Sequence, residues 1–324
     1  QTEITCVTAP GVGKDLRWSV TVGGQVSTVF TSDTTAYVVP ELEDLSGAAV
    51  DSPSTSLTEG GSEIVITGDY FGPLGVNSDI QAHYGPSGSP NKYTATNCAV
   101  SSSQTEIRCH TIPGVGSGLM WSVTVGGQGS GVLTSETTRY ANPTVSSLSG
   151  AAAAGADGTT TEGGADIVLT GTNFGPADAG TSISVYYGPV SEPKKYDATA
   201  GCTLTHAHTT VTCKTVAGVG ANLKWQVEIE GQASIASSST TKYIVPSIDG
   251  LSGDAMAVSG TTTYGGAAIS IAGTNFGPSS HTEVIAQYGP SGSTEKYTAN
   301  GCAVISQTEI TCVTAPGVGK DLRW

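Results

Sequence analysis

The chain has 324 residues, of which 44 are Gly and 12% are charged, and its formal net charge is −14. Nucleic-acid binding draws most of its affinity from Lys and Arg, so this acidic balance excludes a nucleic-acid partner. No run approaches the ~18 consecutive apolar residues of a membrane-spanning helix, so we expect no membrane insertion in this segment. The length predicts two or three domains.

Repeated residues divide the chain into units of about 100 residues. Trp and Cys each recur at spacings of 103, 104 and 99 residues, at Trp18, Trp121, Trp225, Trp324, Cys6, Cys109, Cys213 and Cys312. Residues 1–18 are identical to residues 307–324, so the sequence repeats after 306 residues, or three units. We therefore interpret the chain as a window cut from a longer array, with both cuts inside a domain.

Short segments that alternate apolar and polar side chains predict β-strands along the whole chain. In chain order, residues 18–22, 62–67 and 121–125 alternate in this way, with Trp, Val or Ile on the inner face. Their further copies are 167–169, 225–229 and 269–271. Gly-Gly, Gly-Pro and Pro-Gly pairs separate the runs, and no segment longer than ten residues carries a helical apolar stripe. The pattern predicts an all-β fold in units the size of an immunoglobulin-like sandwich.

A longer signature resembles a known family. The signature begins with Glu59-Gly60-Gly61 and continues to Phe71-Gly72-Pro73. It is followed by a pair of cysteines, a Pro-Gly-x-Gly segment and a Val-x-Val-Gly-Gly-Gln segment. This combination resembles the IPT/TIG domain and implies tandem immunoglobulin-like β-sandwich domains in a linear array. The transcription-factor branch of the family needs basic loops for DNA, which this chain lacks, so the resemblance favours the extracellular branch of receptors and repeat proteins.

Prolines mark the expected domain boundaries, because Pro40, Pro143 and Pro246 each open a unit. We expect a C-terminal part of an IPT/TIG domain, two complete domains and the N-terminal part of a cut domain. These are the first unit (residues 1–39), the second (40–142), the third (143–245) and the fourth (246–324). Since Pro restricts φ at each junction, we expect the units to stack end to end.

The seven cysteines predict one structural disulfide in each unit. The pairs lie 10 or 11 residues apart and are Cys98–Cys109, Cys202–Cys213 and Cys302–Cys312. Cys6 is the copy of Cys312, so its partner is expected in a preceding repeat. Buried free thiols or a zinc site are the alternatives, but the paired Cys-x-x-Cys ligands of zinc sites are missing. Disulfides predict an extracellular or cell-surface location.

Candidate catalytic and metal sites are weak, because a site built into the unit should recur in every copy. His206 and His208 form a His-x-His pair that could bind a metal, and exposed polar side chains are the alternative. The repeated Trp is expected in the core or at a domain edge, with a ligand platform as the alternative. We predict no enzyme activity, no catalytic residue, no cofactor and no metal.

We expect O-linked rather than N-linked glycosylation. Asn142 has a sequon shape that Pro143 blocks, whereas Ser/Thr clusters are plentiful. The clusters singled out as possible O-glycosylation sites are Thr159, Thr160, Thr161, Thr261, Thr262 and Thr263.

Two hypotheses of function remain. The first is a structural segment of an extracellular fibre or surface appendage, whose partners are neighbouring copies of itself and O-linked glycans. The alternative is the ectodomain of a large adhesion or receptor protein that binds protein or glycan. Recurrence after 306 residues favours the first, since an adhesin usually diversifies its domains.

Overall fold

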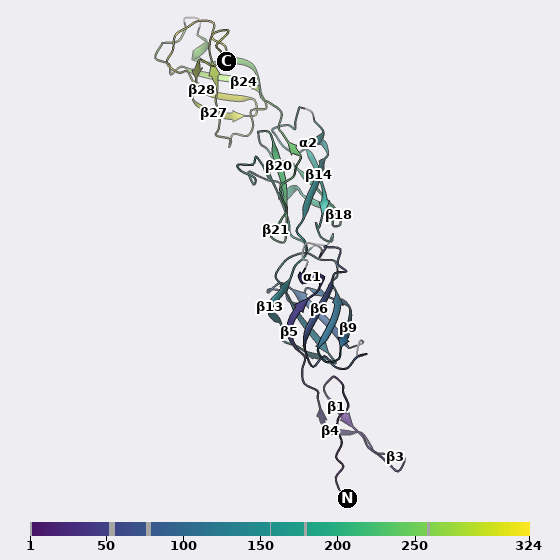
Figure 1. The fold of residues 1–324 in the computed structure, drawn as a ribbon. Coiled ribbons are helices and arrows are strands. Elements are labelled where there is room, and N and C mark those ends of the chain that lie inside the picture. The colour runs from purple at the N-terminus through teal and green to yellow at the C-terminus, as the bar shows by residue number, and fades with distance from the viewer. Residues whose placement is uncertain (1, 52–55, 76–78, 156, 178–179, 258–259) are drawn as a thin grey trace.

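The computed structural model describes residues 2–51, 56–75, 79–155, 157–177, 180–257 and 260–324. The four units follow one another along one line, from the first unit at the N-terminus to the fourth at the C-terminus (Figure 1). Strands make up most of the regular secondary structure of the described residues, and the helical segments have three or four residues each. They are α1 (Ala48–Asp51), α2 (Ala151–Ala154), η1 (Thr199–Gly201) and η2 (Asp254–Met256). The predicted all-β fold class is confirmed.

The second unit is a sandwich of two antiparallel sheets. Its first sheet has the order β5-β6-β10-β9, and its second has the order β12-β11-β7-β8, with β13 also paired to β11. The strands are β5 (Glu41–Ser46), β6 (Glu63–Asp69), β7 (Ile80–Gly85), β8 (Tyr93–Thr94), β9 (Thr96–Ser102), β10 (Glu106–His110), β11 (Leu119–Val125), β12 (Gln128–Gly129) and β13 (Leu133–Thr138). This is the immunoglobulin-like arrangement that the alternating pattern predicted.

The third unit repeats both sheets. Its first sheet is β14-β15-β19-β18, and its second is β17-β16-β20-β21, with β22 also paired to β20. The strands are β14 (Thr144–Ser149), β15 (Asp166–Thr172), β16 (Ile183–Gly188), β17 (Tyr196–Asp197), β18 (Thr203–His206), β19 (Thr210–Lys214), β20 (Leu223–Ile229), β21 (Gln232–Ala233) and β22 (Thr240–Thr241). The sequence repeat is therefore also a repeat of topology.

The first and fourth units are each part of a sandwich. The fourth has a complete first sheet, β23-β24-β28-β27, and a two-stranded remnant of the second, β25-β26. The first unit has two strand pairs, β1-β4 and β2-β3. The strands are β1 (Leu16–Trp18), β2 (Thr21–Val22), β3 (Gln25–Val26), β4 (Phe30–Thr35), β23 (Ser247–Ser252), β24 (Ala268–Thr274), β25 (Gln287–Tyr288), β26 (Tyr297–Thr298), β27 (Asn300–Ser306) and β28 (Glu309–Val313).

Each complete sandwich is filled by the inner faces of its two sheets. In the second unit Ile64 and Ile66 of β6 are fully buried, as their alternation predicted. The repeated tryptophan belongs to this core, since Trp121 is fully buried and stacks on Tyr84 with ring centroids 4.2 Å apart. Trp225 stacks on Tyr187 in the same way at 4.0 Å, so the Trp is a core residue in both complete units.

The same strand is exposed in the first unit, contrary to the inward-facing expectation. Trp18, Val20 and Val22 repeat the sequence pattern of β11, yet 41%, 43% and 63% of their surfaces are accessible. The reason is physical: alternation places these side chains on one face of a strand, but only a facing sheet can bury them. The first unit has no such sheet among its described strands.

Among the described residues, no helix has both the length and the apolar character needed to cross a bilayer.

Candidate functional site

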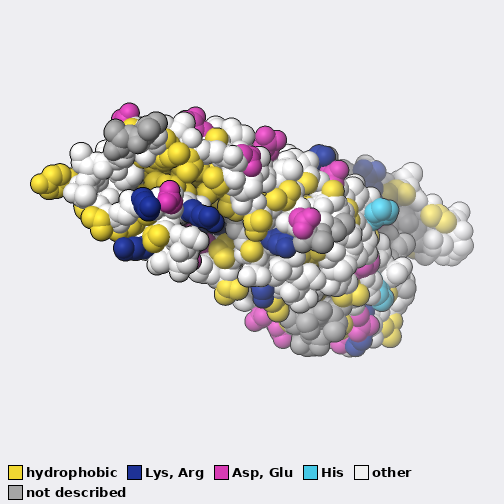
Figure 2. Space-filling view, turned by 90° about the horizontal axis from the view of Figure 1, so that it is seen from above, with side chains coloured by type: hydrophobic (Ala, Val, Ile, Leu, Met, Phe, Trp, Pro, Cys, Tyr) yellow, Lys and Arg dark blue, Asp and Glu magenta, His cyan; other side chains and the backbone are white. Residues whose placement is uncertain are grey.

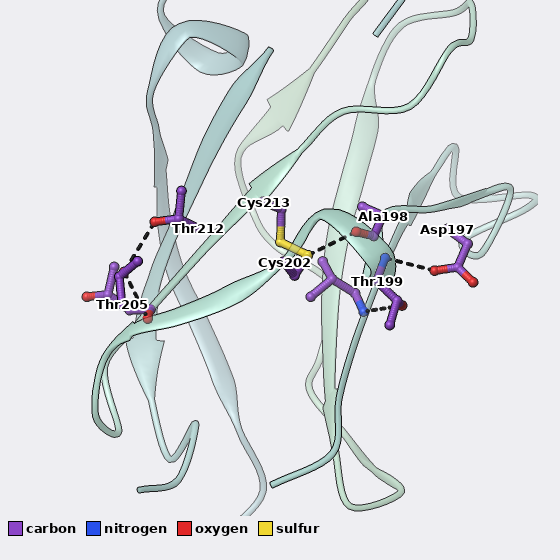
Figure 3. Close-up of a disulfide and its surroundings, with 9 residues drawn as sticks. Asp197, Ala198, Thr199, Cys202, Thr205, Thr212 and Cys213 are labelled. Atoms are coloured by element: carbon purple, nitrogen blue, oxygen red, sulfur yellow. Dashed lines mark hydrogen bonds between the residues drawn. A yellow bond between two sulfur atoms is a disulfide. The ribbon is translucent and has the colours of Figure 1, made fainter. Parts of the chain in front are cut away.

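A disulfide ties the outer strand of the first sheet to its neighbour in each unit that has this sheet. Cys98–Cys109 joins β9 to β10, Cys302–Cys312 joins β27 to β28, and Cys202, just before β18, bonds to Cys213 of β19 (Figure 3). Cys6 is free and exposed. Cys109, Cys213 and Cys312 are buried in their unit cores, so each bridge anchors an edge strand to the core.

Successive units contact one another at joints, which are formed by loops and turns at the ends of the sandwiches. We number them in chain order: the first joint lies between the first and second units, the second joint between the second and third, and the third joint between the third and fourth. At each joint a Gly-Val-Gly loop of the preceding unit reaches into the next. Val115 is 3% exposed and packs into the core cluster of the third unit, although it belongs to the second. Val318, the copy of Val115 in the fourth unit, is 64% exposed.

A glycine receives this valine on the following unit. Gly175 has φ +86°, and a Cβ built there would collide with Cγ1 of Val115. Gly277 has φ +88°, and its Cβ would collide in the same way with Val219. Both the left-handed backbone and the close approach require glycine, which gives the repeated Phe-Gly-Pro tripeptide a structural role at the second and third joints.

A buried glutamine of the following unit holds the first joint and the second joint. The Gln128 side chain donates a hydrogen bond across the first joint to the Tyr37 carbonyl, 3.0 Å away. Its copy Gln232 donates across the second joint to the Tyr140 carbonyl at 2.9 Å and to Oδ1 of Asn142 at 3.2 Å. Leaving a buried amide without a hydrogen-bond partner costs free energy, so these bonds hold successive units in one orientation.

A third set of contacts joins a threonine to a turn of the next unit. At the second joint the Thr58 hydroxyl lies 2.8 Å from Nδ1 of His208, and its backbone N–H donates to Asn173 at 3.4 Å. At the third joint Thr161 and Gln307 exchange two hydrogen bonds, one of them from Nε2 of Gln307 to the Thr161 carbonyl at 3.1 Å. His208 thus contacts a residue across a joint, whereas the sequence suggested either a His-x-His metal pair or an exposed polar side chain.

One ion pair spans the second joint. Nζ of Lys92 lies 3.8 Å from Oε1 of Glu230, with both side chains about a third exposed. An exposed pair of this kind contributes about 0–1 kcal/mol, so the packed Val and the buried Gln dominate the joint.

Paired tyrosines connect the core to the joint. The Tyr84 and Tyr140 hydroxyls lie 2.8 Å apart, and the Tyr140 carbonyl is the acceptor of the Gln232 bond. Burial raises the pKa of Tyr84 to about 12, and burial also raises the pKa of Tyr140 strongly. Tyr187 and Tyr243 repeat the pair at 2.6 Å in the third unit. Both phenols of a pair therefore stay neutral at physiological pH.

The two threonine clusters differ in burial. Thr159 and Thr161 are buried, while Thr160 between them is exposed. Thr159 bonds to Lys242 and Ile244 of its own unit, whereas Thr161 bonds to Gln307 across the third joint. Their copies Thr261 and Thr263 are exposed, as is Thr262. Within the described residues no group of three or more His, Cys, Asp or Glu is arranged to hold a metal ion.

Comparison with known proteins agrees with this geometry. The sequence model of the IPT/TIG domain family matches residues 51–140, which span most of the second unit. This segment is an IPT/TIG domain. The third unit shares its topology and its signature residues, so the IPT/TIG pattern extends beyond the matched range. No curated protein sequence matches the chain.

The solved structures that match the chain include two SGBP-B proteins and an adhesin. The surface glycan-binding protein PbSGBP-B of Prevotella bryantii is 14% identical, with a TM-score of 0.38 over 78% of this chain and 55% of its own. A second such protein, SGBP-B of Bacteroides uniformis, is 12% identical, with a TM-score of 0.23 over 86% and 95%. The Escherichia coli adhesin FdeC is 14% identical, with a TM-score of 0.24 over 87% and 92%. The likeness is one of fold.

The joint residues were not predicted from the sequence as a site. Their signal was present, because Gln25, Gln128 and Gln232 recur at spacings of 103 and 104 residues inside a repeated Gly-Gly-Gln or Glu-Gly-Gln turn. A repeated surface glutamine has no evident function within one sandwich. Only the placement of the next unit shows what it contacts.

Proposed function

We propose that the chain is a stiff structural segment of an extracellular fibre or surface appendage built from tandem IPT/TIG domains. The observation that carries the proposal is the recurrence of the same contacts at successive joints. Gln128 and Gln232 bind the preceding unit through the same backbone position, and Val115 and Val219 seat against equivalent glycines of the following unit. A joint made the same way each time propagates one geometry along the chain.

The joint contacts are head-to-tail, which suits an open array. The third unit presents the Val219 loop at one end, and Gly175 and Gln232 at the other. Contacts between two different surfaces do not close on themselves unless the rotation forms a ring, so added units lengthen the rod. The straight succession of units in Figure 1 is the arrangement expected of such an array.

An extracellular setting is supported by one disulfide in each unit that has the first sheet. Such bridges persist in oxidising compartments. We propose neighbouring copies of the unit as the partners and a non-catalytic role. For O-linked glycans we propose Thr160 and its copy Thr262, because both are exposed whereas Thr159 and Thr161 are buried.

Electron microscopy of the native material tests the proposal. We expect long uniform rods roughly 35 Å wide that advance about 35 Å per unit, from the size of a 100-residue domain. The three-unit sequence period then gives an axial repeat on the order of 100 Å. Short or clustered particles without an axial repeat would contradict a fibre.

The second candidate is the ectodomain of a large adhesion or receptor protein that binds protein or glycan. The names of the similar solved structures, two surface glycan-binding proteins and an adhesin, state such roles and no filament. Binding of the chain to an array of glycans, retained when Gln232→Ala loosens the second joint, would favour this candidate. A rod without any glycan binding favours the first.

A further inference from the structure

The two incomplete units are complementary halves of one sandwich. The fourth unit has all four strands of the first sheet and, from the second sheet, β25 and β26, which correspond to β7 and β8 of the second unit. The first unit has β1 with β2, β3 and β4, which correspond to β11, β12 and β13. What one unit lacks among its described strands, the other supplies.

The open side of the fourth unit is apolar and hollow. A cavity of about 500 Å³ at the third joint is lined by Val219, Tyr243, Phe276, Ala286 and Trp324, among others. Hydrophobic side chains gather on the fourth unit, which lies at the left of Figure 2. A second cavity of about 480 Å³ lies beside Tyr288 and Gly317 of the same unit. An exposed apolar face of this kind in a sandwich calls for a covering strand.

We propose that a segment with the sequence of residues 19–39, following Trp324 in the same polypeptide, fills both cavities and completes the fourth unit. The sequence basis is the identity of residues 1–18 with residues 307–324, which places this segment next in the 306-residue period. The inference extends the proposed function, but it holds equally for an array of any length.

The first cavity fits the hairpin of this segment. In the second unit the β11–β12 hairpin brings Gly126 against the preceding unit, where a Cβ would lie 2.7 Å from the Gly13 nitrogen. Gln128 beside it donates to the Tyr37 carbonyl. At the third joint the corresponding surface is Gly220 and the Tyr243 carbonyl, and both residues line the first cavity. The copy of Gln25 in this segment would therefore donate a hydrogen bond to the Tyr243 carbonyl, as Gln232 does to the Tyr140 carbonyl.

The second cavity fits the tyrosine of this segment. Tyr140 and Tyr243 each donate to a backbone carbonyl of the preceding loop and pair with a core tyrosine hydroxyl. Tyr37 makes the same carbonyl bond in the first unit, to Ala9 at 2.6 Å. In the fourth unit Tyr288 and Ala315 are the matching partners, and both line the second cavity. A copy of Tyr37 placed there completes the pair.

The receiving surface is already formed. Trp324 stacks on Tyr288 with centroids 4.2 Å apart and planes inclined by 13°, close to the 4.2 Å and 9° of Trp121 on Tyr84. Trp121 donates its indole N–H to Thr138 at 2.9 Å, and Trp18 donates to Thr35 at 3.0 Å. The copy of Thr35 would supply the same acceptor to Trp324.

The same polypeptide is a better source than a second copy of the chain. In a second copy, residues 19–39 are preceded by residues 1–18, which have the same sequence as residues 307–324. Two identical segments would then compete for one place in the fourth unit, and one would have to leave its strand β28. A covalent continuation needs no such displacement.

The test compares the full chain with the same chain extended after Trp324 by a copy of residues 19–39. Hydrogen exchange of peptides within residues 284–324 is the measurement, because burial under a new strand protects their amides. We expect exchange at Ala286 to Tyr288 to slow by roughly tenfold or more in the extended chain. Acrylamide quenching of tryptophan fluorescence should fall at the same time, since Trp324 becomes buried.

A scrambled extension of the same composition is the control and should leave exchange unchanged. An extension carrying Tyr37→Ala in the copy should protect the first cavity but not the second. Equal exchange in the native-sequence and scrambled extensions would overturn the proposal. So would association of the unextended chain that protects residues 284–324 and disappears when residues 19–39 are deleted, since a second copy would then be the source. Neither result would bear on whether native material forms uniform rods.

Discussion

Glycine at the joint illustrates how a single residue acts across two domains. Gly175 lies in the third unit, but its lack of a side chain serves Val115 of the second. Gly164 has a similar left-handed backbone, with φ +84°, but nothing lies within 4 Å of a Cβ built there. The two glycines therefore share the backbone requirement and differ in the contact. This difference makes the joint contact measurable on its own.

We predict that Gly175→Ala destabilises the chain more than Gly164→Ala. Both pay the left-handed penalty of about 1–2 kcal/mol, and overpacking against Val115 adds roughly 1–3 kcal/mol. Urea unfolding of the two variants measures the difference. Val115→Ala combined with Gly175→Ala should recover part of the loss, and equal stabilities of the two glycine variants would contradict a tight joint.

Alkaline pH should weaken the complete units through their tyrosine pairs. The pKa of Tyr84 is about 12 in the folded chain, above the ordinary value near 10, because burial disfavours its phenolate. The folded state thus holds this proton more tightly than the unfolded state does. Its stabilising effect is full below pH ~10 and declines as the pH rises towards 12, by about 1.4 kcal/mol per pH unit for each such group.

Tyrosinate absorbance and circular dichroism followed together test this expectation. Ionisation of the buried tyrosines should coincide with loss of β structure. Tyr84→Phe should remove the contribution of that hydroxyl and flatten the alkaline decline, although it leaves Tyr140 without one partner. Ionisation of all tyrosines near pH ~10 with the fold intact would contradict the burial of the pair.

At the scale of the strand, the disulfides and the hairpins do different work. The bridge from Cys202 to Cys213 closes a short loop and holds an edge strand that has a partner on one side only (Figure 3). The β20–β21 hairpin, by contrast, carries Gln232 out of its own sandwich to the preceding unit. One element therefore stabilises a unit, and the other couples two units.

Removal of one disulfide should destabilise its own unit. Cys202→Ala with Cys213→Ala opens a loop with a separation of 11 residues, for which the chain-entropy relation gives about 3 kcal/mol. Calorimetry should show a lower melting temperature for the third unit alone. Cys6→Ala is the matched control, because Cys6 is exposed and unbonded. An unchanged melting profile for the double variant would contradict a stabilising bridge.

At the scale of the whole molecule, the joints decide whether the units form a rod or a flexible string. A Pro at each boundary restricts one dihedral angle, but the packed valine and the buried glutamine restrict the orientation of whole domains. Domains that are joined only by a linker, or that share only a small polar interface, usually move relative to one another. The stiffness of the rod therefore rests on side chains far from the linker in sequence.

Gln232→Ala should loosen the second joint without unfolding either unit. The lost hydrogen bonds, and the Tyr140 carbonyl left without its partner, cost about 1–3 kcal/mol. Small-angle X-ray scattering and the spread of bend angles in electron micrographs should report a more flexible rod. Gln25→Ala is the control, since Gln25 is the exposed copy in the first unit. A bend distribution equal to that of the unaltered chain would show that the valine contact alone suffices.

Much of the architecture was determined by the sequence itself. The repeat of Trp and Cys defined the unit, and the alternation of Ile64 with Ile66 defined a strand and its inner face, because a period of two is a local property of the backbone. The spacing of 10 or 11 residues between cysteines predicted which of them pair. The alternating strand of the first unit was also predicted, but its burial was not, since burial depends on a facing sheet.

The joints were decided only by the tertiary structure. Val115, Gly175 and Gln232 lie in three separate turns, and no local pattern shows that they meet across one boundary. The threonine clusters teach the same lesson, because Thr161 looks like open loop until Gln307 of the following unit contacts it. Sequence periodicity reports which face of an element is apolar, whereas the identity of what covers that face depends on how whole domains are placed in space.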